Sequence, residues 1–296
     1  MKMKKFIRAA AVFTLICILS TVLFGCRPND APTRDETQQA VQANASPYEA
    51  QTWTDFVRDD TTREDFSEDE TQKIVVRVTV PEGYSFMQIA ELLESNGVCS
   101  AKDFYEVCQS YSPKSFSIPS SSDRCFKMEG YLFPDTYEFY TNDSPRSVLI
   151  KMLNNFHAKV GDIDDDTLIL ASMIEKEARS SEHMKLVSSV FRNRLETGGD
   201  YKYLNSDPTR DYVNKYITDN PLVAEQSKYA PLYNTYNKRA GLPAGPICCP
   251  GLKAIDAARN PAETDYYYFF YGADGTNHYS KTLEEHNSQM AQYGVG

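Results

Sequence analysis

The chain is poor in the basic residues that nucleic acid binding requires. Its 296 residues include 31 Lys and Arg against 41 Asp and Glu, which gives a net charge of −10. Because contact with phosphates needs a local concentration of Lys and Arg, we expect no nucleic acid partner. Only one apolar run approaches the length of a membrane span, so a multi-span membrane protein is excluded.

Several motifs of well-known enzyme classes are also absent. The chain has no G-x-S-x-G, no P-loop and no G-x-G-x-x-G sequence, which argues against common serine hydrolases, nucleotide hydrolases and dinucleotide-dependent enzymes. The few histidines lack the H-x-H and H-E-x-x-H spacings of zinc sites, and no cysteine pair has C-x-x-C spacing. We therefore predict neither a metal nor a cofactor. The histidines are His157, His183, His278 and His286.

The seven cysteines do not form an obvious disulfide framework. Cys17 lies within the apolar run and Cys26 at its end, so an odd number remains in the rest of the chain. At least one of these is therefore unpaired or paired with another molecule. Small buried side chains are the favoured interpretation, and the disulfide state stays open. These cysteines are Cys99, Cys108, Cys125, Cys248 and Cys249.

The N-terminus has the pattern of an export signal. Four basic residues among the first eight precede the mostly apolar segment 9–25. One interpretation is a signal peptide in which the sequence LFGC resembles a lipobox, so that Cys26 would carry lipid; the other is an uncleaved single-pass helix. Both predict a chain tethered to the cell membrane through residues 1–26, with the remainder on the extracytoplasmic side.

The next segment, residues 27–72, contains twelve acidic and four basic residues, with prolines that interrupt any periodic pattern. Such a composition buries too little apolar surface to offset the entropy of ordering. It predicts an acidic, disordered linker that holds the following domains away from the membrane.

Ordered structure is predicted from residue 73. A β-branched strand at 74–80 is followed by a helix that starts at a capping box, Ser85 with Gln88, and then by a second helix that starts at Ser100. A strand followed by two helices resembles a LysM-like glycan-binding module, assigned to residues 73–125. The same pattern occurs in other small α+β modules, so the residues alone leave the choice open.

Residues 126–296 are predicted to form a larger α+β domain. Aromatic residues around Pro134 and Asp135 suit strands, segments 145–160, 167–178 and 187–195 suit helices, and the aromatic run 266–271 suits a buried strand.

Helix 167–178 is apolar on nearly every side, yet Glu175 and Glu177 lie at its end. A carboxyl group at the edge of an apolar face loses hydration, and the resulting rise in pKa suits a general acid. Helical spacing does not choose between the two glutamates. The alternative is a structural glutamate paired with Arg179, Arg192 or Arg194.

Seven motifs together resemble the endolytic murein transglycosylases of the YceG-like family. They are EGYLFPDTY (129–137), ASMIEKEA (171–178), VFRNRL (190–195), SDPT (206–209), YNTY (233–236), GLPAGPI (241–247) and EHN (285–287). The resemblance covers about residues 73–296. It implies an α+β body, without metal or cofactor, anchored by one N-terminal membrane segment.

The resemblance further implies an enzyme, a peptidoglycan lytic transglycosylase. Such an enzyme cleaves MurNAc–GlcNAc β-1,4 bonds within nascent glycan strands, leaves 1,6-anhydro-MurNAc ends and limits chain elongation. It would act beside the cell-wall synthesis machinery, including penicillin-binding proteins. The first glutamate of the E-K-E motif, Glu175, corresponds to the catalytic residue. The residues expected to shape the substrate site are Asn205, Asp207, Tyr233, Asn234 and His286.

Two other functions stay open. Cys249 occupies a position where the family usually has Asn, which favours, as an alternative, a non-catalytic peptidoglycan-binding lipoprotein. A solute-binding lipoprotein has weaker support, because the sequence shows no repeat that would give two similar lobes.

Overall fold

The computed structural model describes residues 73–114, 116–119 and 122–294, which belong to one compact unit, Thr54–Gly296. The predicted anchor (1–26) with Cys26 and the predicted linker (27–72) lie outside the described residues. The strands are β1 (Val75–Thr79), β2 (Thr136–Tyr140), β3 (Tyr268–Tyr271) and β4 (Asn277–Ser280). The α-helices are α2 (Phe86–Ser95), α3 (Ala101–Ser110), α4 (Pro145–Val160), α5 (Asp165–Glu177), α6 (Ser181–Thr197), α7 (Asp207–Tyr212), α8 (Gln226–Tyr233), α9 (Leu252–Arg259) and α10 (Leu283–Tyr293). Two short turns are the 3-10 turn η1 (Gly199–Tyr201) and the π-helical turn η2 (Val213–Ile217).

The first strand and two helices lie where the sequence predicts them. The capping box is confirmed, because the Ser85 hydroxyl accepts from the Gln88 N–H while the Gln88 side chain accepts from the Ser85 N–H. Likewise, the Ser100 hydroxyl accepts from the Asp103 N–H at the start of α3. Each cap pairs an N–H group that the first helical turn leaves without a partner, which fixes both helix starts.

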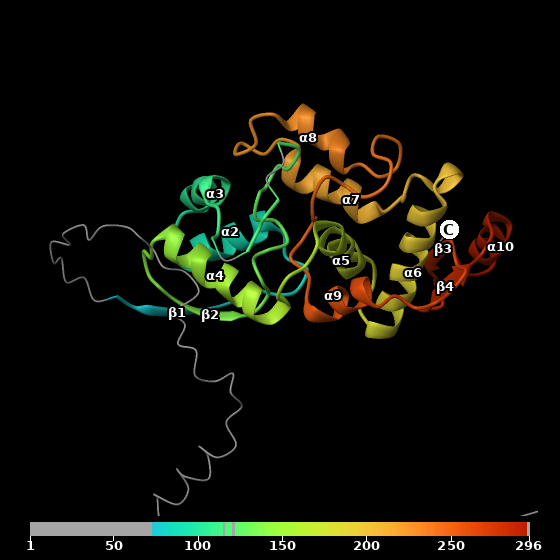
Figure 1. The fold of residues 1–296 in the computed structure, drawn as a ribbon, viewed down its shortest axis with the longest axis horizontal. Helices are drawn as coiled ribbons and strands as arrows, with labels where there is room; N and C mark the ends of the chain where they lie inside the picture. The colour runs from blue at the N-terminus through green and yellow to red at the C-terminus, as the bar shows by residue number, and fades with distance from the viewer. Residues whose placement is uncertain (1–72, 115, 120–121, 295–296) are drawn as a thin grey trace, which may run out of the picture. The chain divides into compact units, whose positions relative to one another are not determined.

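A later strand completes this part of the fold. β1 and β2 pair antiparallel, with Val75 opposite Tyr140 and Thr79 opposite Thr136, which gives the order strand, helix, helix, strand (Figure 1). The pairing joins residues on both sides of the boundary predicted after residue 125. Helix α4 also packs against α3 across it. The division into domains at that residue and the likeness to LysM stay predictions, and the described fold is a mostly helical α+β domain with two small sheets.

Helix α5 lies at the centre of the molecule and packs against α9 and α6 (Figure 1). Every residue from Leu168 to Ile174 is buried, as the apolar pattern predicts. The Asp164 carboxylate caps its N-terminus by accepting from the Thr167 N–H at 2.9 Å. The rigid core around this helix fixes the position of the residues at its C-terminal end.

Two of the sequence motifs meet beside α5. Gly130 has a φ of +88°, and a Cβ atom there would lie 2.7 Å from Cγ of Pro246 and 3.3 Å from Cδ2 of Leu168. Only glycine fits this left-handed backbone at such a close approach. The EGYLFPDTY segment and the GLPAGPI loop are therefore locked together against α5.

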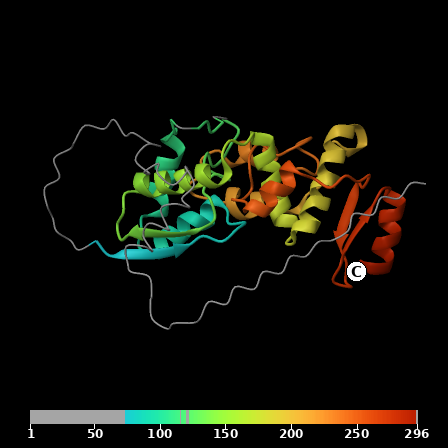
Figure 2. The same ribbon diagram turned by 60° about the horizontal axis from the view of Figure 1, so that its bottom comes forward.

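The C-terminal hairpin lies at the opposite end of the described fold from β1 and β2 (Figures 1 and 2). β3 and β4 pair antiparallel, with Tyr271 opposite Asn277, and α10 packs on them. The aromatic run does form a strand, but the prediction that it is buried is wrong, because its residues are half-buried or exposed. One face packs on α6, where Phe269 meets Phe191 edge to face, while the other face borders a cavity. A two-stranded sheet has too little cover to bury both faces.

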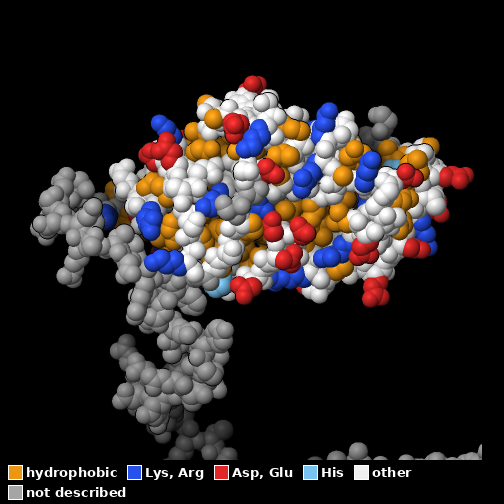
Figure 3. All heavy atoms as spheres, turned by 45° about the horizontal axis from the view of Figure 1, so that its top comes forward, with side chains coloured by type: hydrophobic (Ala, Val, Ile, Leu, Met, Phe, Trp, Pro, Cys, Tyr) orange, Lys and Arg blue, Asp and Glu red, His pale blue; other side chains and the backbone are white. Residues whose placement is uncertain are grey.

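All five cysteines in the described residues are free, and four of them are buried, which agrees with the interpretation of small core side chains. Acidic and basic side chains are interspersed on the face that Figure 3 draws. None of the helices in the described part of the chain combines the length and hydrophobicity that a membrane crossing needs.

Candidate active site

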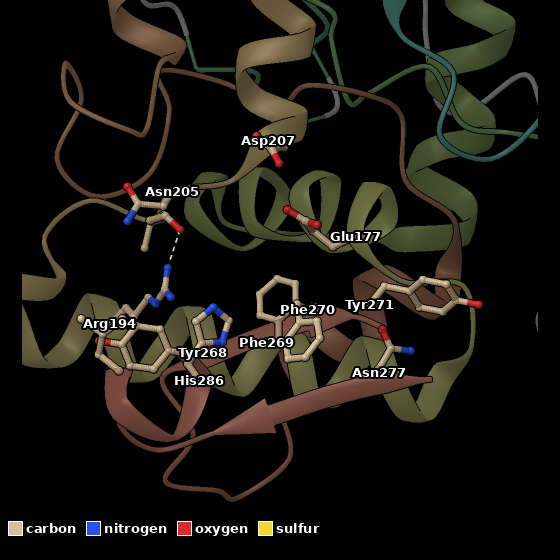
Figure 4. A pocket seen from close by; sticks show the side chains of 12 residues that line it. Glu177, Arg194, Asn205, Asp207, Tyr268, Phe269, Phe270, Tyr271, Asn277 and His286 are labelled. Carbon is tan, nitrogen blue, oxygen red and sulfur yellow. Dashed lines mark hydrogen bonds between the residues drawn. The ribbon is translucent and has the colours of Figure 1, made fainter. Parts of the chain in front are cut away.

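Glu177 is the last residue of α5, and its side chain reaches a cavity at the end of that helix (Figure 4). Oε1 of its carboxyl group accepts a hydrogen bond from the Ser206 hydroxyl at 2.7 Å. Burial raises the pKa of Glu177 to about 7, while the bond from Ser206 and the charge of Arg194 act in the opposite direction and the charge of Asp207 adds to the rise. A substantial fraction of Glu177 is therefore protonated at neutral pH, as a general acid requires.

The loop that carries Ser206 is held by a network of hydrogen bonds between the SDPT and YNTY motifs. The Ser206 N–H donates to Oγ1 of Thr235 at 3.2 Å, and the Thr209 hydroxyl donates to the Ser206 carbonyl at 2.7 Å. Asn205 adopts a φ of +51°, an uncommon conformation for a residue other than glycine, and its N–H donates to the Thr235 carbonyl at 3.1 Å. This backbone costs roughly 1 kcal/mol or more, and the surrounding bonds hold it in place.

Arg194 of the VFRNRL motif connects the same loop with the C-terminal hairpin. Its guanidinium group donates from Nη1 to the Leu204 carbonyl at 2.7 Å and from Nε to the Tyr267 carbonyl at 2.6 Å. The group also lies over the ring of Tyr268, 5.3 Å from its centroid. The rigid planar fork of Arg thus sets the distance between the two walls of the cavity.

The cavity beside Glu177 has a volume of about 460 Å³. Asn205, Asp207 and His286 line it together with Glu177, and Figure 4 shows Asp207 and His286 on opposite sides of the acid. Tyr268 also lines it, stacked on His286 with the ring centroids 5.2 Å apart. Polar side chains and aromatic rings in one cavity suit a ligand that has both hydroxyl groups and apolar faces.

Two of these residues, His286 and Asp207, have close neighbours that constrain them. Burial, together with the nearby charge of Arg194, lowers the pKa of His286, so its imidazole is neutral at neutral pH. Asp207 is engaged by two donors, Nη2 of Arg210 at 2.5 Å and the Tyr236 hydroxyl at 2.7 Å. Both donors bind Oδ1, so the carboxyl group is held in one orientation at the wall of the cavity.

Glu175 points to different partners. Its Oε2 accepts from the N–H of Gly251, the residue at the start of α9, at 3.0 Å, and its Cγ lies close to Gly83. A carboxylate at a helix N-terminus is stabilised by the helix dipole and by the free N–H groups there. Burial, with the charge of Glu82 in addition, raises the pKa of Glu175. The neighbouring Lys176 donates to the Gly83 carbonyl at 3.2 Å, so Lys176 fastens the turn after β1 to α5, while Glu175 fastens the start of α9 to it.

A second cavity, of about 930 Å³, lies on the Glu175 side. Glu177, Tyr271 and Asn277 line both cavities, so the two meet at the acid. Figure 4 shows Tyr271 and Asn277 beside Glu177, away from Asp207 and His286. Together the cavities form a groove with Glu177 at its middle.

Three of the six residues predicted for the site thus come together with Glu177. Tyr233 does not join them, because its side chain is fully buried and packs against Tyr212. Asn234 directly follows α8, and its side chain accepts from the Tyr236 N–H at 3.0 Å. Glu175 lines the second cavity, and its catalytic assignment stays a prediction. Tyr233 and Asn234 lie in a motif whose hydrogen bonds support Ser206, so their part in the site is indirect.

Sequence reasoning did not single out Ser206, Tyr268 or Tyr271. Ser206 belongs to the SDPT motif and its position alone does not reveal which glutamate it contacts. Tyr268 and Tyr271 belong to the aromatic run that was expected to be buried. Within the described residues, no three His, Cys, Asp or Glu side chains are arranged to hold a metal ion.

The fold and the groove define a mostly helical α+β protein with a carboxylic acid of raised pKa at the centre of an open binding site. The chain belongs to the YceG-like family, whose profile matches residues 57–292. It is 32% identical over 238 residues to an endolytic murein transglycosylase of Bacillus subtilis, an alignment that covers 73% of this chain and 65% of the relative.

Other relatives agree with this assignment. An endolytic murein transglycosylase of Streptococcus pneumoniae is 27% identical over 258 residues, which cover 76% of this chain and 46% of the relative. The chain thus spans about half to two thirds of the length of the curated relatives it matches. The crystal structure of a yceG-like protein from Listeria monocytogenes is similar with a TM-score of 0.59 at 28% identity, covering 72% of this chain and 75% of that one.

Proposed function

We propose that the chain is an endolytic peptidoglycan lytic transglycosylase, in which Glu177 is the general acid and then the general base. The observation that carries the proposal is the position of Glu177, a carboxyl group with a pKa of about 7, in a groove that Asn205, Asp207 and His286 also line. The names of the relatives support the substrate, because murein is the glycan of the bacterial cell wall.

The first step would be protonation of the leaving oxygen. Glu177 donates its proton to the oxygen of the β-1,4 bond between MurNAc and GlcNAc as the bond from C1 to that oxygen breaks. Since Oε1 already accepts from Ser206, Oε2 is the oxygen that carries the transferred proton. Developing positive charge at C1 is stabilised by the N-acetyl group of the same sugar, without a second protein carboxylate.

The second step would return the proton. The C6 hydroxyl of MurNAc attacks C1, and Glu177, now a carboxylate, takes the hydroxyl proton. The products are a free GlcNAc hydroxyl and a 1,6-anhydro-MurNAc end, and Glu177 is protonated again. Most glycosidases use two carboxylates. Here the nucleophile is the sugar's own C6 hydroxyl, so one carboxyl group serves as acid and then as base.

The proposal also includes a place and a biological role. The basic residues followed by an apolar run at 9–25 support a chain held at the cell membrane with the groove outside. Cleavage within nascent strands would limit their length beside penicillin-binding proteins.

The test is digestion of purified sacculi by the full chain, with mass spectrometry of the released fragments. We expect new anhydro-MurNAc ends, which Glu177→Gln abolishes and Glu175→Gln reduces only in part. Loss with Glu175→Gln and full activity with Glu177→Gln would return the catalytic role to Glu175. Binding to sacculi without any new anhydro end would instead support the non-catalytic wall-binding lipoprotein.

A further inference from the structure

The second cavity differs in chemistry from the first. The first is lined by several aromatic rings, and its charged residues besides Glu177, which are Arg194 and Asp207, are both engaged by neighbouring residues. The second has one aromatic ring and more charged side chains, of both signs. These are Glu82, Glu175, Lys176 and Arg179, besides Glu177 itself. A neutral sugar ring would gain little from such a lining, whereas a ligand with its own charges would gain more.

Two of these charges have no counterion within the described part of the chain. Glu82 and Arg179 are both exposed, and neither makes a hydrogen bond or ion pair with another described residue. Glu175 and Lys176, in contrast, are fastened to Gly251 and Gly83. The cavity therefore presents one free carboxylate and one free guanidinium group to a ligand.

The chemistry of the substrate provides a matching group close to the reacting bond. In peptidoglycan, the sugar that is cleaved at C1 is MurNAc, and the same ring carries the stem peptide on the lactyl group at C3. The peptide must therefore leave the glycan within one sugar ring of the acid. It contains side-chain or terminal carboxylates and, before cross-linking, a free amino group.

We propose that the second cavity holds the stem peptide of the MurNAc residue whose bond is cleaved, with Arg179 binding a peptide carboxylate and Glu82 binding the free amine. This inference rests on the proposed function, and it names the part of the substrate that each cavity takes. Tyr271 and Asn277, which line both cavities, stand where the peptide diverges from the glycan. The enzyme then favours strands that still carry uncross-linked peptides, as newly made strands do.

The test compares glycan strands that carry stem peptides with strands from which an amidase has removed them. Binding is measured by calorimetry with the full chain carrying Glu177→Gln, which prevents turnover. We expect Arg179→Gln and Glu82→Gln each to weaken binding of the peptide-bearing strands by about two- to fivefold, the range for exposed ion pairs, and not to change binding of stripped strands. Arg77→Gln and Glu91→Gln are matched controls, because both residues are exposed and line neither cavity.

A second measurement does not depend on the Glu177 variant. With Glu177 intact, Arg179→Gln and Glu82→Gln should raise KM for peptide-bearing strands, with kcat and the rate on stripped strands unchanged. Equal weakening on both kinds of strand would mean that the cavity holds glycan, and no weakening on either would place the cavity outside the binding site. Either result would contradict the proposed peptide site without contradicting the proposed transglycosylase activity. Failure of the Glu177→Gln chain to bind either strand would instead contradict the proposed function.

Discussion

The hydrogen bond from Ser206 to Glu177 predicts a measurable shift in the pH dependence of catalysis. The bond favours the ionised carboxylate and so lowers the pKa of Glu177, although burial, the larger effect, raises it to about 7. A hydrogen bond to a charged group contributes about 1.5 kcal/mol, and one pKa unit corresponds to about 1.4 kcal/mol. Ser206→Ala should therefore raise the pKa of Glu177 by about one unit, to about 8.

The consequence for activity follows from the role of the acid. Glu177 must be protonated when it meets substrate, so kcat/KM falls as the pH rises through its pKa. In the native chain this fall should be centred near pH 7, and in Ser206→Ala it should move about one unit upward. Below both pKa values the two rates should differ much less than above them.

The assay is the initial rate of anhydro-MurNAc release from sacculi between pH 5 and pH 9. Ser189→Ala is the matched control, because Ser189 is also buried but its hydroxyl bonds the Leu186 carbonyl and Thr264. An unchanged alkaline limb in Ser206→Ala, or one that moves downward, would refute the assignment of the titrating acid to Glu177. The same shift in Ser189→Ala would show that the effect is not local.

Three further predictions concern stability and the thiols. Glu129 is fully buried, and burial raises its pKa from 4.5 to about 7. The folded chain therefore binds this proton more tightly than the unfolded chain does, so the free energy of unfolding falls as the pH rises from about 4.5 to about 7. Urea unfolding at pH 5 and pH 8 should show this loss reduced by up to about 3 kcal/mol in Glu129→Gln. Gly130→Ala forces a Cβ atom against Pro246 in a left-handed conformation and should destabilise the chain by about 3 kcal/mol or more, measured as a lower Tm. The control Gly161→Ala, which has open space around it, should cost about 1 kcal/mol. Burial raises the thiol pKa of Cys99 to about 11 and of Cys125 to about 12, so neither should react with a thiol reagent at pH 8 until the chain is unfolded, which mass spectrometry of the labelled peptides would check.

Local signals in the sequence are sufficient to predict most helices. The capping box at Ser85 and the apolar pattern of 145–160 depend only on neighbours within a few residues, and both are confirmed. The pairing of β1 with β2 joins segments nearly sixty residues apart, and its register is set by tertiary packing. The same limit explains the error at β3, because a run of aromatic residues does not reveal how many layers will cover it.

The site is predictable to a similar degree. Asn205, Asp207 and His286 were expected to shape it, and they line one cavity although they lie in separate motifs. Tyr233 was also expected to shape the site, because tyrosine rings commonly contact sugars, but its side chain is buried against Tyr212. Whether a polar aromatic residue faces a ligand or the core depends on contacts that its own motif does not contain.

The choice between the two glutamates depends on helix geometry together with distant residues. Residues two positions apart on an α-helix point about 200° apart, so Glu175 and Glu177 have different partners although both line the second cavity. Glu175 contacts Gly251 and Gly83, whereas Glu177 accepts a hydrogen bond from Ser206 and lies near the charge of Arg194. The Gly251 N–H holds Glu175 at the start of α9, whereas Glu177, with a pKa of about 7, can release and regain a proton near neutral pH. Glu177 lines both cavities, whereas Glu175 lines the second and not the first. Under the proposed mechanism, this position lets Glu177 reach the bond of a sugar whose peptide enters the second cavity.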